Sequence, residues 1–412
     1  MHPYHPTRRM WDTKKELQMI IFVCSGARIR CGASRPLPEP HKLSHPRADA
    51  RMHDPDAGPF WGRPPCGLGS AVTVLLNTSP CASCPSTRLL EEVVASLLVH
   101  SPCLAGCSLL LLADGCKLHA SKYAWKSGQV TQDKADVYAR YLARVQHLCT
   151  APGSALHGAQ LVALQEHHGC AHALRRGLAR TATRYVLSVQ HDRPLCADVD
   201  LGRLVAALDA DPACNTLLLP TLATLEYAGK ASSRSLPGDL FAPVLVGGAV
   251  TCTPLAAFLD STHLGRAQWY RDTVFGNNRL VPLCRGCFLE DSFGQAQLAL
   301  LRDAARAGIG RETLLRTGCY VVADIPAAVV CHLDGHDQLC SDPGWRKWRH
   351  RRWHCDQEEL DRLQVCGTLP SALPPDSLVS GFFDGVWAPK RQAGTRPWGA
   401  AAAAADVGAV AT

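Results

Sequence analysis

Residues 166–194 form the stretch EHHGCAHALRRGLARTATRYVLSVQHDRP, and this stretch decides the fold class. Gly169 precedes a segment with helical periodicity, and the apolar run Tyr185–Gln190 comes next and leads into the acid Asp192. In open α/β sheets, ligands bind outside the carboxyl ends of the strands. The stretch therefore predicts a helix, a buried strand and an acid that meets a ligand at the end of that strand.

The rest of the chain extends this pattern in both directions. The predicted strands are 71–77, 108–113, 161–164, 185–190, 216–219 and 319–323. The predicted helices are 88–100, 133–148, 201–208, 292–307 and 311–316, a further helical segment is expected between Gly169 and Tyr185, and Asp260–His263 is expected to end another helix. Alternation of strands and helices predicts an α/β fold with a mostly parallel sheet and helices on both faces.

Composition limits the classes of protein that this chain can belong to. The 412 residues include 43 basic and 36 acidic ones, for a net charge of +7, and 47% are hydrophobic. This mild charge suits an anionic small ligand, and nucleic acid is not an expected partner. No run of about 20 apolar residues is present, so no transmembrane segment is predicted. The short apolar run 19–24 follows basic residues as in a signal peptide, but we favour a disordered leader.

Twenty cysteines are spread along the chain, including positions inside predicted strands and helices. Small disulfide-rich scaffolds are short and rich in loops, so we expect mostly free thiols with a few bridges. Cys81/Cys84 and Cys284/Cys287 each form a C-x-x-C pair. A zinc ion shared by the two pairs is the alternative, although structural zinc sites have closer spacing.

The order of glycine, helix, strand and terminal acid resembles the nucleotide-sugar half of GT-A glycosyltransferases, above all the inverting family-two type. The resemblance covers about residues 71–335 and rests on four blocks: the loop after the first strand, Asp114-Gly115, Gln190-His191-Asp192 and Glu290-Asp291. It implies a GT-A-like fold with a Rossmann-like nucleotide-binding half and an acceptor half. It also implies a nucleotide-diphosphate sugar as donor, in particular a UDP sugar, a glycan or other hydroxyl acceptor, and Mn²⁺ or Mg²⁺.

The resemblance divides the chain into three parts. Residues 1–69, rich in Pro, His, Arg and Gly, are predicted to be a disordered leader. Residues 70–368 form the GT-A-like domain, with the nucleotide-sugar half at 70–220 and the acceptor half at 221–368. Residues 369–412 are a low-complexity tail that ends in an alanine-rich segment. The Golgi lumen, usual for eukaryotic members of the fold, and the cytoplasm both remain open as compartments.

The donor site is implied by the resemblance. Thr78 marks the loop that contacts the base, and Asp114 contacts the base or the ribose, although an Asp-Gly pair is also typical of a turn. Gln190-His191-Asp192 stands where the family has DxD, with Asp192 as the direct metal ligand. Gln190 replaces the first acid, which leaves a metal-independent or inactive protein open. His332 is the additional metal ligand.

The catalytic base is expected in the block Glu290-Asp291, which resembles the family's ED block. Inverting transfer needs a base opposite the leaving diphosphate, and we assign Asp291 to this role, with Glu290 second. The alternative is an acidic helix N-terminus that is stabilised by the helix dipole. The basic and aromatic cluster 345–353 could bind phosphates, glycans or nucleic acid, but Arg349 stands where the processive motif QxxRW has glutamine.

Three functions are open, in order of preference. The first is a glycosyltransferase that moves a sugar from a nucleotide donor to a hydroxyl with inversion. The second is a GT-A-like protein that binds a nucleotide sugar without catalysis, as Gln190 suggests. The third is a sugar nucleotidyltransferase, which would need a glycine-rich basic loop that Asn77-Thr78-Ser79-Pro80-Cys81 does not supply.

Overall fold

The computed structural model describes residues 61, 67–81, 83–121, 128–232, 236–276, 281, 283, 286–325 and 327–332. The chain divides into two units, Met1–Pro370 and Ser371–Thr412, and every described residue belongs to the first. The predicted leader (residue 61 and residues 67–69 apart), the predicted tail, the basic cluster 345–353 and Cys284 lie outside the described residues.

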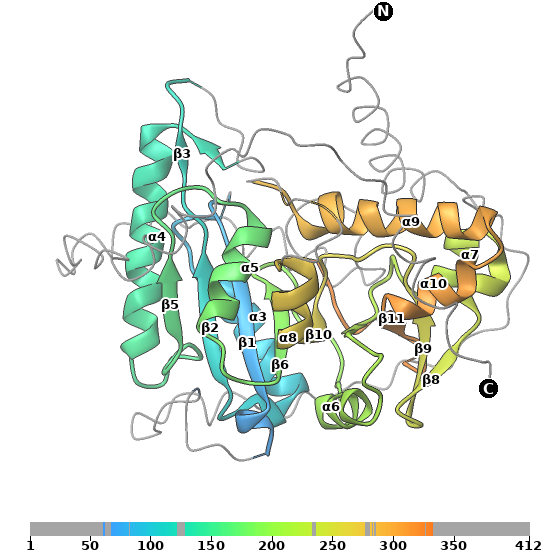
Figure 1. Cartoon of the computed structure of the whole chain (residues 1–412). Coiled ribbons are helices and arrows are strands. Elements are labelled where there is room, and N and C mark those ends of the chain that lie inside the picture. Colours follow the sequence, from blue (N-terminus) through green and yellow to red (C-terminus); the bar gives the residue numbers. More distant parts are fainter. Residues whose placement is uncertain are drawn as a thin grey trace, which may run out of the picture. The chain divides into compact units, whose positions relative to one another are not determined.

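One nine-stranded sheet organises the described part of the chain, in the order β5-β2-β1-β6-β10-β7-β11-β9-β8 (Figure 1). β10 runs antiparallel to both of its neighbours, and so does β9, while the other pairings are parallel. The strands of this sheet are β1 Val72–Thr78, β2 Ser108–Ala113, β5 Gln160–Ala163, β6 Tyr185–Gln190, β7 Thr216–Leu218, β8 Val244–Val246, β9 Val250–Pro254, β10 His263–Arg266 and β11 Cys319–Val322. Two short strands, β3 Lys117–Leu118 and β4 Gln129–Val130, pair separately.

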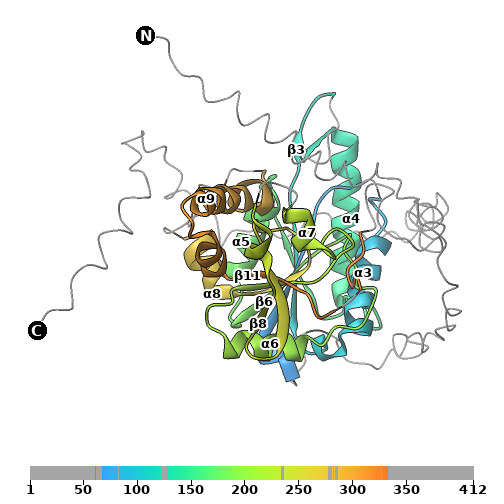
Figure 2. The ribbon, with the colours of Figure 1, turned by 90° about the vertical axis from the view of Figure 1, so that its right-hand side faces the viewer.

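Helices cover both faces of this sheet, with α5, α8 and α9 on one side and α3 and α4 on the other (Figure 2). The α-helices are α3 Arg88–His100, α4 Gln132–Thr150, α5 Cys170–Ala179, α6 Leu201–Ala210, α7 Tyr227–Ser232, α8 Ala267–Trp269, α9 Gln295–Arg306 and α10 Gly310–Arg316. Single turns of π-helix span Tyr270–Val274 and Glu290–Gly294, and short 3-10 turns span Gly67–Ser70, Pro102–Leu104 and Gly238–Phe241. The predicted α/β class with a largely parallel sheet is confirmed.

The prediction of a helix that ends at Asp260–His263 is wrong. A loop leads from β9 into β10, which begins at His263 and lies in the middle of the sheet between β6 and β7. The four residues of β10, His-Leu-Gly-Arg, carry no strand propensity of their own, and they are extended because neighbours on both sides pair with them. Gly265 is needed there, since an added Cβ would lie 2.9 Å from the Tyr270 ring.

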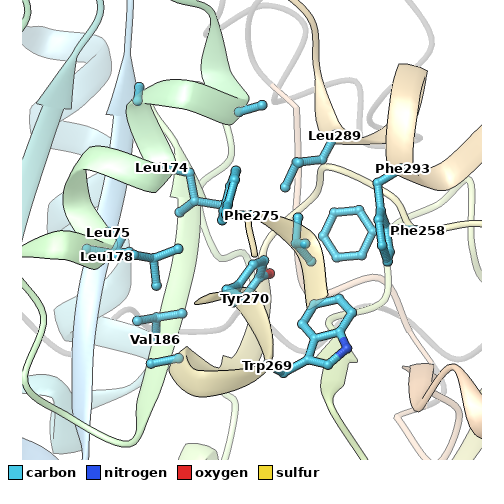
Figure 3. Packing of buried hydrophobic residues seen from close by; sticks show 14 of the residues in the cluster. Leu75, Leu174, Leu178, Val186, Phe258, Trp269, Tyr270, Phe275, Leu289 and Phe293 are labelled. Carbon is cyan, nitrogen blue, oxygen red and sulfur yellow. The ribbon is translucent and has the colours of Figure 1, made fainter. Parts of the chain in front are cut away.

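The largest described hydrophobic cluster joins the two halves of the sheet (Figure 3). Helix α5 lies close on β1 and β2, and Gly177 permits this approach because an added Cβ would meet Leu112 at 2.7 Å. Farther along, Phe258 is surrounded by aromatic rings at centroid distances of 5.2–6.4 Å. These rings belong to His263, Trp269, Tyr270 and Phe293. The cluster fixes the start of β10 against β6, which positions the polar residues at that edge of the sheet.

Two further expectations concern cysteines and membranes. Every cysteine in the described ranges is a free thiol, in agreement with the expectation of mostly free thiols. None of the helices in the part of the chain that the structure describes is both long and apolar enough to span a membrane.

Candidate functional site

The predicted donor-site residues Thr78, Asp114 and Gln190–Asp192 lie at the carboxyl ends of β1, β2 and β6. Thr78 lies in register with Ala113 of β2, and Asn77 lies in register with Gln190 of β6. The next strand of the sheet in sequence after β1 is β2, which pairs with one side of β1, while β6 pairs with the other side. The direction in which successive strands are added to the sheet therefore reverses at β1. Such a reversal is where ligands bind in open α/β sheets. β10 runs in the opposite direction, so the residues before it enter the sheet at this same edge.

Asp192 and His332 are 140 residues apart in sequence and lie side by side in the structure. Nε2 of His332 is 2.9 Å from Oδ2 of Asp192, and both side chains are largely buried. Backbone hydrogen bonds hold the two segments together: Cys331 donates to the Pro194 carbonyl at 3.0 Å, and Cys196 donates to the Val329 carbonyl at 2.9 Å. The two residues that the sequence predicts as metal ligands are therefore neighbours.

Oδ1 of Asp192 is the part of this pair that can take a ligand. It is buried, and within the described residues no group hydrogen-bonds to it. Burial alone would raise the pKa of Asp192, but the hydrogen bond from His332 and the charges of His332, His191 and Arg193 hold it well below its usual range. The carboxylate is therefore ionised at neutral pH, and one of its oxygens is available.

A carboxylate oxygen and an imidazole nitrogen are suitable ligands for a divalent cation such as Mn²⁺. Within the ranges that the structure describes, no group of three or more His, Cys, Asp or Glu side chains is arranged to hold a metal. The available oxygen of Asp192 and the adjacent His332 thus fit a cation whose remaining ligands come from a bound molecule, such as the oxygens of a diphosphate.

Gln190 and His191 take part in contacts that hold the edge together. The Gln190 side-chain amide donates to the Asp260 carbonyl, which ties β6 to the segment before β10. The His191 backbone N–H donates to the Asn77 carbonyl at 2.9 Å, and its side chain hydrogen-bonds to Cys81. The neutral Gln190 thus positions a neighbouring strand, a task that a carboxylate could not perform because it has no donor.

Three more buried polar atoms at this edge were not assigned from the sequence. They are Oδ1 of Asn77, Oγ of Ser261 and Oγ1 of Thr262, and none of them has a hydrogen-bond partner among the described residues. Buried polar groups are nearly always hydrogen-bonded, so several such atoms at one edge indicate a surface that binds a polar ligand. The sequence signal was the polar run Asp260-Ser261-Thr262-His263 between apolar segments, whose place in the fold is set only by the pairing of β10.

Thr78 is buried, and its hydroxyl lies 3.0 Å from the hydroxyl of Tyr141 on α4. Its backbone carbonyl accepts from the N–H of Asp114 at 2.9 Å. The structure therefore shows Thr78 joining β1 to α4 and to the end of β2. Its predicted contact with a base stays a prediction.

Asp114 is also buried, and both of its carboxylate oxygens are occupied. Oδ1 accepts from the backbone N–H groups of Gly115 at 3.0 Å and His168 at 2.7 Å. Oδ2 accepts from the N–H of Gly169 at 2.8 Å and lies 2.7 Å from Nδ1 of His167. A carboxylate has about four acceptor positions, so these contacts fill it. Asp114 holds the loop 166–169, and a direct contact with base or ribose stays a prediction that would require one of these contacts to be exchanged.

Glu290 lies against Asp260, a partner that the sequence did not reveal. The Glu290 N–H donates to Oδ2 of Asp260 at 2.9 Å, and the Asp260 N–H donates to Oε2 of Glu290 at 3.3 Å. Burial and the nearby Glu290 charge raise the pKa of Asp260 well above its usual range, and burial raises the pKa of Glu290. Asp291 is exposed at the first turn of the π-helix, so of the two predicted acids it is the one that is open to solvent.

No protein-family model matches the chain, and no curated protein matches it at a significant level. Among solved structures it is similar to S. aureus TarS, with a TM-score of 0.35 and 13% identity over 63% of this chain and 36% of that chain. It is also similar to the mannosyltransferase PcManGT from Pyrobaculum calidifontis, solved with GDP-Man and Mn²⁺ (TM-score 0.35, 15% identity, 77% of this chain and 67% of that chain).

A third similar structure is glucosyl-3-phosphoglycerate synthase from Mycobacterium tuberculosis, solved with Mn²⁺, UDP and glucosyl-3-phosphoglycerate. Its TM-score is 0.35, with 17% identity over 76% of this chain and 89% of that chain. All three are GT-A glycosyltransferases, the family that the sequence resembles. At these TM-scores the similarity assigns no residue, ligand or activity to this chain.

Proposed function

We propose that this chain is a glycosyltransferase that moves a sugar from a nucleotide-diphosphate donor, in particular a UDP sugar, to a hydroxyl group of a glycan or other acceptor, with inversion. The observation that carries the proposal is the buried Oδ1 of Asp192, which has no partner among the described residues and lies beside His332 at the carboxyl edge of the sheet. This edge is where the strand order reverses and where a phosphate-bearing ligand is expected.

The donor occupies the edge between β1, β6 and β10. Oδ1 of Asn77 accepts hydrogen bonds from hydroxyl groups of the ribose or the sugar, and the hydroxyls of Ser261 and Thr262 donate to such groups or accept from them. His191, which follows β6 directly, lies at the same edge. Asp114 contributes indirectly by holding the loop 166–169.

Asp192 and His332 would hold a divalent cation, Mn²⁺ or Mg²⁺, against the diphosphate. Such a cation neutralises the negative charge that develops on the departing diphosphate. Asp192 contributes a carboxylate oxygen for this purpose, since its Oδ1 has no partner among the described residues. Mn²⁺ accepts both oxygen and imidazole ligands, whereas Mg²⁺ prefers oxygen alone.

Asp291 is the general base of the proposed reaction. Its carboxylate takes the proton from the acceptor hydroxyl while that oxygen attacks the anomeric carbon of the donor. The bond between the anomeric carbon and the phosphate oxygen breaks, and its electron pair leaves with the nucleoside diphosphate. Attack from the side opposite the leaving group inverts the configuration. Glu290 is less suited to this role because it is engaged with Asp260.

The donor site is tested by calorimetric titration of the full chain with UDP, GDP and their sugars, with and without Mn²⁺. We expect one nucleotide to bind with Mn²⁺, and Asp192→Ala to weaken this binding at least about tenfold, since a direct ligand is lost. Asp198→Ala is the matched control, because Asp198 is 91% exposed and pairs with His100 elsewhere on the surface. Absence of binding by every nucleotide, or equal binding by Asp192→Ala, would reject the donor site.

The chemical step is tested by donor turnover once the nucleotide is known. We expect Asp291→Asn to lower kcat by about 10²–10⁴-fold with donor affinity unchanged, because general base catalysis is lost while the donor site is intact. Asp303→Asn, an exposed aspartate on α9 that pairs with Arg306, serves as control. Donor binding without turnover in the wild-type chain would favour a binding protein that lacks catalysis, the alternative that Gln190 suggests.

A further inference from the structure

Two thiols lie in contact immediately after β1, outside the proposed donor and base residues. The Cys84 N–H donates to the Cys81 carbonyl at 3.2 Å, which closes a turn, and the two sulfur atoms are 3.6 Å apart. Cys81 is buried and Cys84 is half-buried. Both line a cavity of about 150 Å³ between this turn and α4, with Lys134 and Tyr138 on the opposite side.

This geometry suits conversion of the thiols to a disulfide. A disulfide needs a sulfur separation of about 2.05 Å and Cα atoms about 4.4–6.8 Å apart. A turn closed by a hydrogen bond between its first and last residues holds these Cα atoms within about 7 Å. The two sulfur atoms therefore have less than about 2 Å to close, and side-chain rotation can supply most of that distance.

The surroundings of Cys81 favour reaction at its sulfur. Cys84 hydrogen-bonds to Cys81 and holds the pKa of its thiol well below the ordinary value, against the opposing effect of burial, and His191 and Ser83 lower it further. The pKa of Cys84 is raised in turn by its hydrogen bond to Cys81 and by burial. The thiolate is the nucleophile in disulfide exchange, so Cys81 attacks first and Cys84 resolves.

We propose that Cys81 and Cys84 form a redox-active dithiol that is oxidised to an intramolecular disulfide by small disulfide compounds. The Cys81 thiolate attacks one sulfur of the oxidant RSSR, which gives a mixed disulfide and releases RS⁻, and this anion takes up a proton. Cys84 then loses its proton and attacks the Cys81 sulfur, which releases the second RS⁻. In sum, the dithiol loses two electrons and two protons, and RSSR becomes two RSH.

The position of this dithiol ties it to the proposed donor edge. Cys81 contacts His191, the residue before Asp192. Closure of the disulfide removes the Cys81 thiol that hydrogen-bonds to His191. The proposal does not depend on the proposed function, because thiol oxidation is measured without any nucleotide.

The test equilibrates the full chain with mixtures of reduced and oxidised glutathione, alkylates the remaining thiols after an acid quench, and maps them by mass spectrometry. We expect the segment with Cys81 and Cys84 to lose both alkylation sites together as the oxidised fraction rises, while Cys103 stays alkylated. Cys103 is a suitable internal reference because it is half-buried in the 3-10 turn before β2, at the opposite edge of the sheet.

The variant Cys84→Ser separates the two steps. We expect Cys81 to stop at the mixed disulfide with glutathione in this variant, and addition of excess reduced glutathione to restore the thiol. Circular dichroism confirms that the variant is folded. Full alkylation of Cys81 and Cys84 at every glutathione ratio would overturn the proposal, and so would oxidation of Cys103 in step with the pair.

Discussion

Asp114 and Asp192 are two buried carboxylates at the same edge of one sheet, and their surroundings differ. Asp114 accepts three backbone N–H groups and lies beside His167, so all of its acceptor positions are used. Asp192 has one oxygen beside His332 and one buried oxygen without a partner among the described residues. A buried charge that is fully satisfied serves the fold, whereas one that is half satisfied can bind a ligand.

The difference arises because a different segment of the chain packs against each of the two carboxylates. At the end of β2, the loop 166–169 packs against Asp114. Its N–H groups point toward the carboxylate because Gly169 adopts a φ of +85°. After the end of β6, residues 329–332 lie beside the segment 194–196 and form backbone hydrogen bonds with it. They supply a single imidazole, that of His332, to Asp192. The comparison predicts that substitutions at the first carboxylate mainly change stability and those at the second mainly change binding.

The largest effect on stability is expected for Asp114→Ala. Removal of the carboxylate leaves two buried N–H groups and one partly buried N–H group without this acceptor and takes away a charged neighbour of His167, so the free energy of unfolding should fall by about 3–5 kcal/mol. Urea unfolding measures this loss. The control Asp209→Ala removes a half-exposed partner of Arg184 and should cost less than about 1 kcal/mol. If Asp114→Ala lowers the free energy of unfolding no more than this control does, the contrast between Asp114 and Asp192 is wrong.

A smaller effect is expected for Gly169→Ala. An alanine at a φ of +85° is strained, and its Cβ would lie 2.6 Å from the Cα of Gly286, so the free energy of unfolding should fall by about 1–3 kcal/mol. Gly248→Ala is the matched control, since Gly248 has a φ of +68° and open space around the added Cβ. Chemical denaturation of both variants gives the difference, and equal losses would show that the loop 166–169 adjusts without cost.

The smallest effect on stability is expected for Asp192→Asn, a loss of about 1–2 kcal/mol at neutral pH, because the amide keeps an acceptor and a donor of similar shape and only the charge is removed. The pKa of Asp192 is lowered in the folded state, so its ionised form stabilises the fold above the unfolded pKa of about 3.9, and this stabilisation is lost as the pH falls below that value. Urea unfolding at several pH values between neutral and acidic should show the wild type losing its advantage over the variant below about pH 4. An advantage that grows on acidification would mean that the charge is not stabilised in the fold.

The sequence predicted the nucleotide-binding half of the fold closely and the second half less well. The run Tyr185–Gln190 was assigned its observed bounds as a strand, because a short run dominated by apolar and β-favouring residues leaves few alternatives. β10 was missed because its residues have no strand pattern, and its pairing with β6 and β7 determines its conformation. Local sequence cannot encode a strand whose stability comes entirely from partners far away in the chain.

Some features of the candidate site likewise follow from the sequence, and others follow only from the structure. The sequence by itself determined that Asp192 follows a buried strand and that Glu290 and Asp291 begin a helical segment, because both conclusions need only neighbouring residues. Only the tertiary structure decided that His332 reaches Asp192 and that Asp260 engages Glu290 while Asp291 is exposed. It also decided that N–H groups of the loop 166–169 occupy the acceptor positions of the Asp114 carboxylate. The physical reason is that hydrogen-bond satisfaction is a property of all groups around an atom, and the chain brings those groups together from separate segments.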